Sequence, residues 1–128
     1  MSAVEEKRIV SKDVVTFLVN GETHDVVVEP QWTLQYVLHD KLGLLGTKEF
    51  CAEGACGACS VILDGRAVLS CMMLAIECGD KPIETIEGIA QANHPLIDAY
   101  IKHSCMQCGF CTPGFVVTAK ALLDRNPD

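Results

Sequence analysis

The hydrophobic pattern of the chain begins with two short runs of β-branched residues. Residues 14–19 (VVTFLV) and 23–28 (THDVVV) are rich in valine, and the Asn20-Gly21 pair between them is strongly favoured in two-residue hairpin turns. Pro30 ends the second run, because proline has no N–H to donate to a sheet. The pattern therefore predicts an antiparallel hairpin.

The next apolar residues recur at a helical spacing. Thr33 can cap the first turn, Gly43 can end the helix, and one face carries the apolar side chains of Leu34, Val37, Leu38 and Leu42. A loop rich in glycine and cysteine follows at residues 46–59.

Two further strand patterns follow that loop. Residues 60–63 and 67–69 flank an Asp64-Gly65 turn, and residues 83–86 alternate between apolar and polar. This order favours a small mixed sheet with a helix across one face, in an α+β fold that occupies residues 12–88 after a polar lead-in at 1–11.

Residues 89–128 have a different pattern, typical of two helices joined by a turn that bears cysteines. The first begins near His94 and carries Leu96, Ile97, Tyr100 and Ile101. In the second, we expect Thr112 as the cap, Pro113 as the first helical residue, and a stop at Asn126-Pro127; its predicted apolar face is Phe115, Val116, Ala119, Leu122 and Leu123. Two helices alone leave apolar faces that need cover.

Composition narrows the class of protein. The 128 residues are 49% hydrophobic, which excludes wholesale disorder, and the formal charge of −7 argues against nucleic acid or an anionic membrane as the main partner. No apolar run is long enough to span a bilayer, and the first eight residues have no apolar stretch of the signal-peptide type. We therefore expect a cytoplasmic protein without membrane insertion.

The eight cysteines are the unusual feature. Cys51, Cys56 and Cys59, with Cys71 further on, follow the C-x4-C-x2-C…C order of plant-type 2Fe-2S sites. Glycines at positions 54 and 57 would let the backbone wrap closely around the cluster, so that its N–H groups reach the sulfurs. Zinc usually uses two separated C-x2-C pairs, which this segment lacks, and disulfides would need an oxidising compartment.

Two motifs resemble those of a known family. Gly46-Thr47-Lys48 followed by the C-x2-G-x-C-G-A-C segment, and residues 107–114 (QCGFCTPG), resemble the iron–sulfur subunit of molybdenum hydroxylases. This family includes xanthine dehydrogenase, aldehyde oxidoreductase and carbon monoxide dehydrogenase. The similarity extends through about residues 12–128.

The resemblance implies a β-grasp ferredoxin domain followed by a helical domain, each with its own 2Fe-2S cluster. Its implied ligands are Cys51, Cys56, Cys59 and Cys71 for the outer cluster, and Cys108 and Cys111 as two of four for the inner one. Gln107 would lie near the pterin of a molybdenum cofactor. The clusters would relay electrons from a large molybdopterin-binding subunit to an FAD-binding subunit, in a heterotrimer or a dimer of heterotrimers.

The sequence departs from the family pattern in two places. Phe50 stands where the family usually has glycine, and no C-x-C pair follows to complete the inner cluster before Asp128. The chain could be shorter than the natural one, or the inner cluster could be absent, altered or completed by another chain. Cys78 and Cys105 match no ligand position, and both are interpreted as structural residues; the alternative for Cys105 is a substitute ligand beside Cys108 and Cys111.

No group of residues resembles a catalytic site. The chain has no Ser/His/Asp set, no paired carboxylates and no phosphate-binding glycine loop before a helix. We therefore expect no substrate chemistry on this chain. Two alternatives to the electron-transfer subunit are a free-standing 2Fe-2S ferredoxin and a small interaction module stabilised by zinc.

Overall fold

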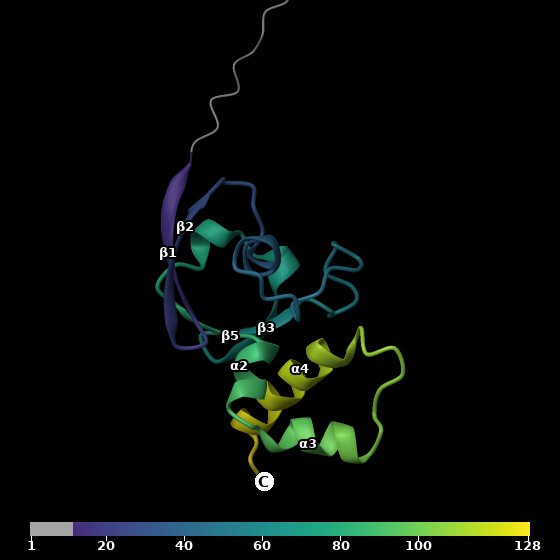
Figure 1. Ribbon diagram of the computed structural model, residues 1–128. Coiled ribbons are helices and arrows are strands. Elements are labelled where there is room, and N and C mark those ends of the chain that lie inside the picture. Colours follow the sequence, from purple (N-terminus) through teal and green to yellow (C-terminus); the bar gives the residue numbers. More distant parts are fainter. Residues whose placement is uncertain (1–11) are drawn as a thin grey trace, which may run out of the picture.

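The computed structural model describes residues 12–128, so the lead-in predicted for residues 1–11 lies outside the described residues. A five-stranded mixed sheet forms the upper part of the molecule in Figure 1, and three helices lie below it. Its strands are β1 (Asp13–Val19), β2 (Glu22–Val28), β3 (Ser60–Leu63), β4 (Arg66–Leu69) and β5 (Pro82–Glu84). Their order is β2-β1-β5-β3-β4, and β5 runs parallel to β1 and antiparallel to β3.

Both predicted hairpins are confirmed. β1 pairs with β2 and β3 with β4, each antiparallel. The turn residues Asn20 and Gly21 have φ angles of +51° and +81°, and Asp64 and Gly65 have +50° and +79°. Two-residue hairpin turns need this left-handed conformation, which explains the Asn-Gly and Asp-Gly pairs.

The predicted first helix begins as expected but changes its winding. Thr33 caps α1 (Leu34–Tyr36) by accepting a hydrogen bond from the Tyr36 N–H at 3.1 Å. The helix then widens into a π-helical turn, η1 (Val37–Lys41), and ends before Gly43. The apolar face lies in the first core, whose fully buried members include Phe17, Leu34, Val37, Leu38 and Val61.

The segment after β4 crosses back toward the first helix through two 3-10 turns, η2 (Ser70–Met72) and η3 (Ala75–Glu77). The N–H of Leu34 donates to the Met73 carbonyl at 2.8 Å, and that of Ala75 donates to the Trp32 carbonyl at 2.9 Å. These bonds fix the segment that begins with Cys71 against the start of α1.

The strand predicted at residues 83–86 is wrong at its end. β5 stops at Glu84, and Thr85 becomes the N-cap position of an unpredicted helix, α2 (Ile86–Gln91). The physical reason lies in tertiary contacts: the Asn20 side chain accepts the N–H of Thr85 at 2.9 Å, and Ile89 is fully buried in a second core. Neither contact could be predicted from the alternating apolar and polar pattern of residues 83–86.

The second core joins the helices to the sheet. Besides α2, it involves α3 (Pro95–Lys102) and α4 (Thr112–Arg125), and Figure 1 shows these helices below β3 and β5. Its buried members are Ile62 of β3 with Ile89, Val116, Val117 and Ala121. Because Ile62 belongs to the sheet, the helices are covered on that side by the sheet itself.

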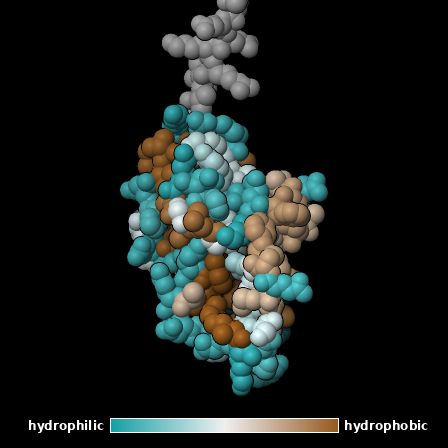
Figure 2. Space-filling model, turned by 45° about the vertical axis from the view of Figure 1, so that its right-hand side comes forward, coloured by the Kyte–Doolittle hydropathy of each residue, from teal (hydrophilic) through white to brown (hydrophobic). Residues whose placement is uncertain are grey.

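Two details predicted for α4 are wrong. Val116 of the predicted face is buried, together with Gly114, Val117 and Ala121, whereas Phe115 and Leu122 of that face are 59% and 55% exposed. Figure 2 shows hydrophobic side chains at the surface in the lower half of the molecule. The helix is apolar on two sides, so spacing alone did not identify the side that packs on β3. In addition, Thr112 is the first helical residue and Cys111 occupies the cap position, because Phe115 N–H already bonds to the Cys111 carbonyl at 3.2 Å.

The start of α3 agrees with the prediction. His94 caps this helix through Nδ1, which accepts the Leu96 N–H at 3.2 Å, and Pro95 is its first residue. None of the helices within residues 12–128 has the length and hydropathy that a membrane span requires.

Candidate metal centre

The first cysteine loop, residues 51–59, is tightly curled ahead of β3. Gly54 and Gly57 have φ angles of +77° and +76°, and Ala52 is also left-handed at +54°. A Cβ at Gly54 would lie 2.9 Å from Cγ of Met72, so a larger residue would collide with that side chain. The two glycines thus have the conformational role expected of them.

The backbone of this loop donates hydrogen bonds to sulfur. The N–H groups of Glu53, Ala55 and Cys56 point at Sγ of Cys51, at 3.3 to 3.4 Å. The N–H of Ala58 donates to Sγ of Cys56 at 3.4 Å. The bonds from Glu53, Ala55 and Cys56 stabilise a negative sulfur and lower the pKa of the Cys51 thiol to about 7.

Cys59 and Cys71 lie in a more enclosed environment. Both are buried, and Ser70 holds the two segments together by donating from Oγ to the Cys59 carbonyl at 2.6 Å. Burial and the neighbouring Cys59 raise the pKa of Cys71 to about 11. A positive metal centre would reverse this cost, because a coordinated thiol is deprotonated.

The four thiols approach one another as two pairs. Cys56 contributes to the lowered pKa of Cys51, and Cys59 contributes to the raised pKa of Cys71, so each pair of thiols lies close together. Within residues 12–128, no three His, Cys, Asp or Glu side chains converge as ligands of a single metal ion. Two pairs suit a dinuclear cluster, in which each iron takes two of the four thiolates. The chemistry and placement of these donors fit a 2Fe-2S cluster.

Sequence reasoning missed two polar side chains that hold the loop stem, residues 46–48. Gln35 is 3% exposed and donates from Nε2 to the Thr47 carbonyl at 3.2 Å. Glu87 accepts the N–H of Gly46 through Oε1 at 2.7 Å. A glutamine beside the apolar stripe of the first helix was the available signal for Gln35; Glu87 belongs to the helix that was not predicted.

The cysteines of the second cysteine loop, residues 103–111, are as a group more exposed than those of the first. Cys105, Cys108 and Cys111 are all exposed, and so is Gln107. Within the described residues, no hydrogen bond reaches the sulfur of Cys108 or Cys111. The structure therefore brings these side chains to one exposed loop between α3 and α4 without forming a ligand cage.

The two cysteine loops meet at the start of α4. A Cβ at Gly114 would lie 2.5 Å from the carbonyl oxygen of Gly57, so glycine permits this close approach. The small cavity at the junction, about 140 Å³, is lined by residues that include Cys56 and Cys111. The two candidate cluster sites are thus direct neighbours.

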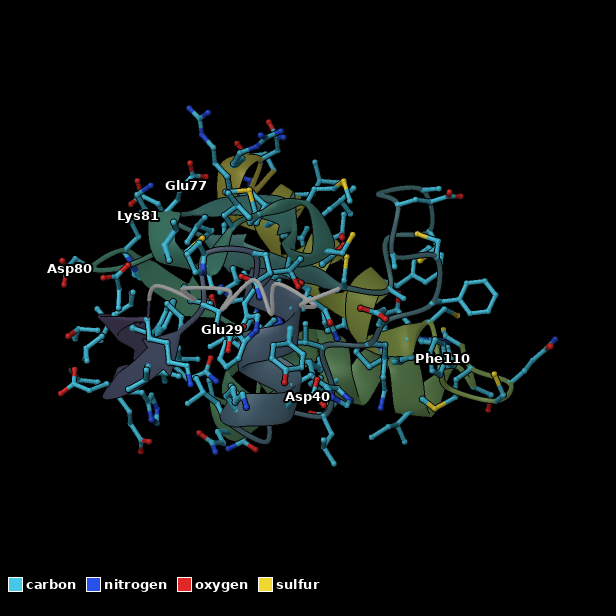
Figure 3. All side chains as sticks on the ribbon, turned by 90° about the horizontal axis from the view of Figure 1, so that it is seen from above. Glu29, Asp40, Glu77, Asp80, Lys81 and Phe110 are labelled. Atoms are coloured by element: carbon cyan, nitrogen blue, oxygen red, sulfur yellow. The ribbon has the colours of Figure 1, made fainter. Side chains whose placement is uncertain are left out.

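An aromatic contact links the same two loops. Phe50 and Phe110 meet edge to face, with 6.2 Å between ring centroids. Phe50 is 78% exposed and Phe110 is 42% exposed, and Phe110 lies toward the right-hand side of the view in Figure 3. The residue that departs from the family pattern therefore contacts the second loop at the surface.

The two cysteines outside the motifs have separate environments. Cys78 is fully buried in the first core, where its Sγ donates to the Leu74 carbonyl at 3.4 Å and burial raises its pKa. This agrees with its interpretation as a structural residue. Cys105 is exposed at the end of α3, and its N–H donates to the Tyr100 carbonyl at 3.0 Å.

Comparisons with known proteins agree with this chemistry. Residues 4–101 match a family described as a 2Fe-2S iron-sulfur cluster binding domain, and residues 85–128 match a second family described as a 2Fe-2S binding domain. The first match covers most of the chain. The two matches contain the first and second cysteine loops respectively.

Relatives with similar sequences are subunits or parts of oxidoreductases. The chain is 43% identical to the nicotinate dehydrogenase small FeS subunit of Eubacterium barkeri, over 92% of this chain and 76% of that protein. It is 48% identical to the aldehyde oxidoreductase of Megalodesulfovibrio gigas, over 86% of this chain but only 12% of that much longer protein.

Solved structures have the same fold. The quinoline 2-oxidoreductase from Pseudomonas putida 86 superposes with a TM-score of 0.86 at 37% identity, over 91% of this chain and 73% of that one. Together with the sequence matches, this identifies the chain as a member of the family of 2Fe-2S iron–sulfur subunits of molybdenum hydroxylase-type oxidoreductases.

Proposed function

We propose that this chain carries electrons between a molybdopterin site in a large partner subunit and FAD in a second partner subunit. A bound 2Fe-2S cluster accepts and donates one electron at a time. The observation that carries the proposal is the first cysteine loop, whose N–H groups already point at sulfur in a pattern suited to a cluster.

Cys51, Cys56, Cys59 and Cys71 are the ligands of the outer cluster in this proposal. The N–H donors around Cys51 and Cys56 withdraw negative charge from the sulfurs, which favours the reduced state. On the other side of the loop, Met72 and Leu69 lie against Gly54, and Cys59 and Cys71 are buried. The chain therefore sets the reduction potential through hydrogen bonds and burial.

Cys108 and Cys111 are proposed to supply two of four ligands to the inner cluster. The other two ligands of this cluster lie outside residues 1–128, or Cys105 is one of them. Gln107, exposed on the same loop, is proposed to lie near the pterin of the molybdenum cofactor. The contact between Gly57 and Gly114 supports electron transfer between the two sites, because it holds the loops together.

The family suggests an assembly in the cytoplasm with the two partner subunits, as a heterotrimer or a dimer of heterotrimers. For the chain itself, we propose a β-grasp domain at 12–88 and a helical cluster-binding domain at 89–128. The first core supports this division, since its fully buried members lie between Phe17 and Ile83.

The test is isolation of the native complex through a tag on this chain. We expect co-purification with the two larger subunits, and about four irons and four acid-labile sulfides per copy of this chain. A lone monomer with about two irons would instead support the free-standing ferredoxin. A colourless protein that contains zinc would support the interaction module.

A further inference from the structure

The first cysteine loop is held from outside by a carboxylate that belongs to neither motif. Glu87, in the first turn of α2, accepts the N–H of Gly46 through Oε1 at 2.7 Å. Its other oxygen accepts the hydroxyl of Thr85 at 2.7 Å. Both carboxylate oxygens are therefore engaged, and the side chain has little freedom to move.

Gly46 is also packed directly against this helix. A Cβ at Gly46 would collide with the side chain of Ile86 and would lie 2.8 Å from Oε1 of Glu87. Two residues later, the N–H of Lys48 donates to the carbonyl of Ala58 at 3.3 Å, which joins the two ends of the cysteine loop. The position of Gly46 thus constrains where the loop closes.

The carboxylate is anchored in turn to the sheet. Nδ2 of Asn20 donates to Oγ1 of Thr85, and the N–H of Thr85 donates to Oδ1 of Asn20, both at 2.9 Å. Asn20 is itself fixed in the β1–β2 turn, where its N–H donates to the Ile83 carbonyl at 2.8 Å. A continuous series of hydrogen bonds therefore connects the turn of the sheet, through Glu87, to the loop stem.

We propose that Glu87 is a positioning residue for the cluster-binding loop: it fixes Gly46 so that the N–H groups of residues 53–58 stay aimed at the cysteine sulfurs. This inference rests on the proposed function, in which that loop holds a 2Fe-2S cluster. An acidic residue is also favourable in the first turn of a helix, where the dipole is positive. Glu87 acts on the cluster only through the loop stem.

The test compares Glu87→Ala, Glu87→Asp and Glu87→Gln in the full chain loaded with iron and sulfide. We measure the rate of cluster loss to a chelator, the reduction potential and the EPR spectrum of the reduced cluster. Alanine removes the acceptor and aspartate is one methylene too short, so both should lose the cluster about tenfold faster and give broadened spectra. Glutamine retains an oxygen acceptor and should remain within about twofold of the wild type.

Two matched controls separate positioning from general effects. Lys120→Ala removes the ion pairs of Lys120 with Glu84, at 3.1 Å, and with Asp124, at 2.7 Å. Lys120 is far from the loop stem in the sequence, so this variant tests the effect of general destabilisation. Glu77→Ala removes an exposed carboxylate near Lys81 (Figure 3) and tests the loss of charge. Both should lose the cluster at the wild-type rate well below their melting temperatures.

Three outcomes would overturn the positioning role: wild-type behaviour of Glu87→Ala and Glu87→Asp, equally fast loss from Lys120→Ala, or no rescue by glutamine. Amide hydrogen exchange in the chain without metal provides a second measurement should a variant load poorly. The Gly46 N–H should exchange about tenfold faster in Glu87→Asp than in the wild type, and an unchanged rate would also overturn the proposal. Failure of the wild type itself to load a cluster would refute the proposed function instead.

Discussion

The two cysteine loops of this protein lie side by side but are built differently. The first has hydrogen bonds from its own backbone to sulfur, a buried Cys59 that lies close to the buried Cys71 of η2, and a stem held by Gln35 and Glu87. The second has three exposed cysteines between two helices. The difference indicates that this chain alone organises the first loop, and we expect the second loop to need further ligands before it can hold a cluster.

The largest effect should come from replacing single cysteines by serine in the first loop and in the second loop. We expect Cys56→Ser or Cys59→Ser to reduce the iron content of the reconstituted chain from about two per molecule to near zero. Cys108→Ser should leave that content unchanged, because the second loop does not hold a cluster in this chain alone. Iron analysis and visible absorption are the measurements.

Cys105→Ser is the matched control for these serine substitutions. Cys105 is exposed on the second loop and is not a proposed ligand of the outer cluster. A loss of iron in both Cys105→Ser and Cys108→Ser would mean that the second loop binds iron without outside ligands, which would break the comparison.

Thiol reactivity should differ sharply among the proposed ligands of the outer cluster. In the protein without metal, the pKa of Cys51 is lowered to about 7 by backbone N–H groups, and that of Cys71 is raised to about 11 by burial. The thiolate is the reactive form, so alkylation of Cys51 should reach half its maximal rate near pH 7. At pH 8 Cys51 should be alkylated faster than Cys71, because Cys51 is then mostly thiolate whereas the buried Cys71 remains mostly protonated.

Mass spectrometry of the labelled peptides measures each cysteine separately. In a urea-unfolded sample, the two cysteines should react alike, which controls for the reagent. The pH of half-maximal alkylation of Cys51 in the folded chain is the decisive value. If it lay near the ordinary pKa of a thiol, the loop would not aim its N–H groups at sulfur.

The junction between the loops should be sensitive to one added carbon. Gly114→Ala would put a Cβ 2.5 Å from the Gly57 carbonyl oxygen, and backbone at both sides of the contact would have to shift. We expect a loss of about 2 kcal/mol in the free energy of unfolding, measured by urea denaturation.

Gly109→Ala is the comparison from the second loop. No atom lies within 4 Å of a Cβ added there, and only the left-handed φ of +82° opposes alanine. It should cost about 1 kcal/mol. Equal costs at the two positions would argue against a tight junction at Gly114.

The smallest effect concerns the exposed aromatic contact. Phe50→Leu and Phe110→Leu, combined in a double-mutant cycle, should give a coupling energy of about 0.5 kcal/mol, because the edge-to-face pair is largely solvated. Thermal or urea unfolding of the four proteins measures it. A coupling energy of zero would mean that the rings do not connect the two loops in solution.

Local chemistry explains which parts of the structure could be predicted. The turns at Asn20 and Asp64 and the cap at Thr33 follow from residue types that tolerate those conformations, and the structure has them where the sequence indicates. The cysteine spacing and the two glycines likewise predict the curled shape of the first loop. Each of these features is encoded within a few consecutive residues.

Features that depend on distant contacts were not predictable. α2 begins at Ile86, where the predicted strand was expected to end, because Thr85 bonds to Asn20, 65 residues earlier in the chain. The side of α4 that packs on β3 is selected by Ile62 and Ile89, so Phe115 and Leu122 are left outside. Glu87 could not be connected to the cysteine loop, because its partner Gly46 is 41 residues away.

The most direct test of the central claim is the iron and acid-labile sulfide content of this chain after anaerobic reconstitution without partner subunits. The account predicts about two irons and two sulfides per molecule, in a red-brown protein, because all four proposed ligands of the outer cluster (Cys51, Cys56, Cys59 and Cys71) belong to this chain. A colourless protein that takes up one zinc and no sulfide would contradict it.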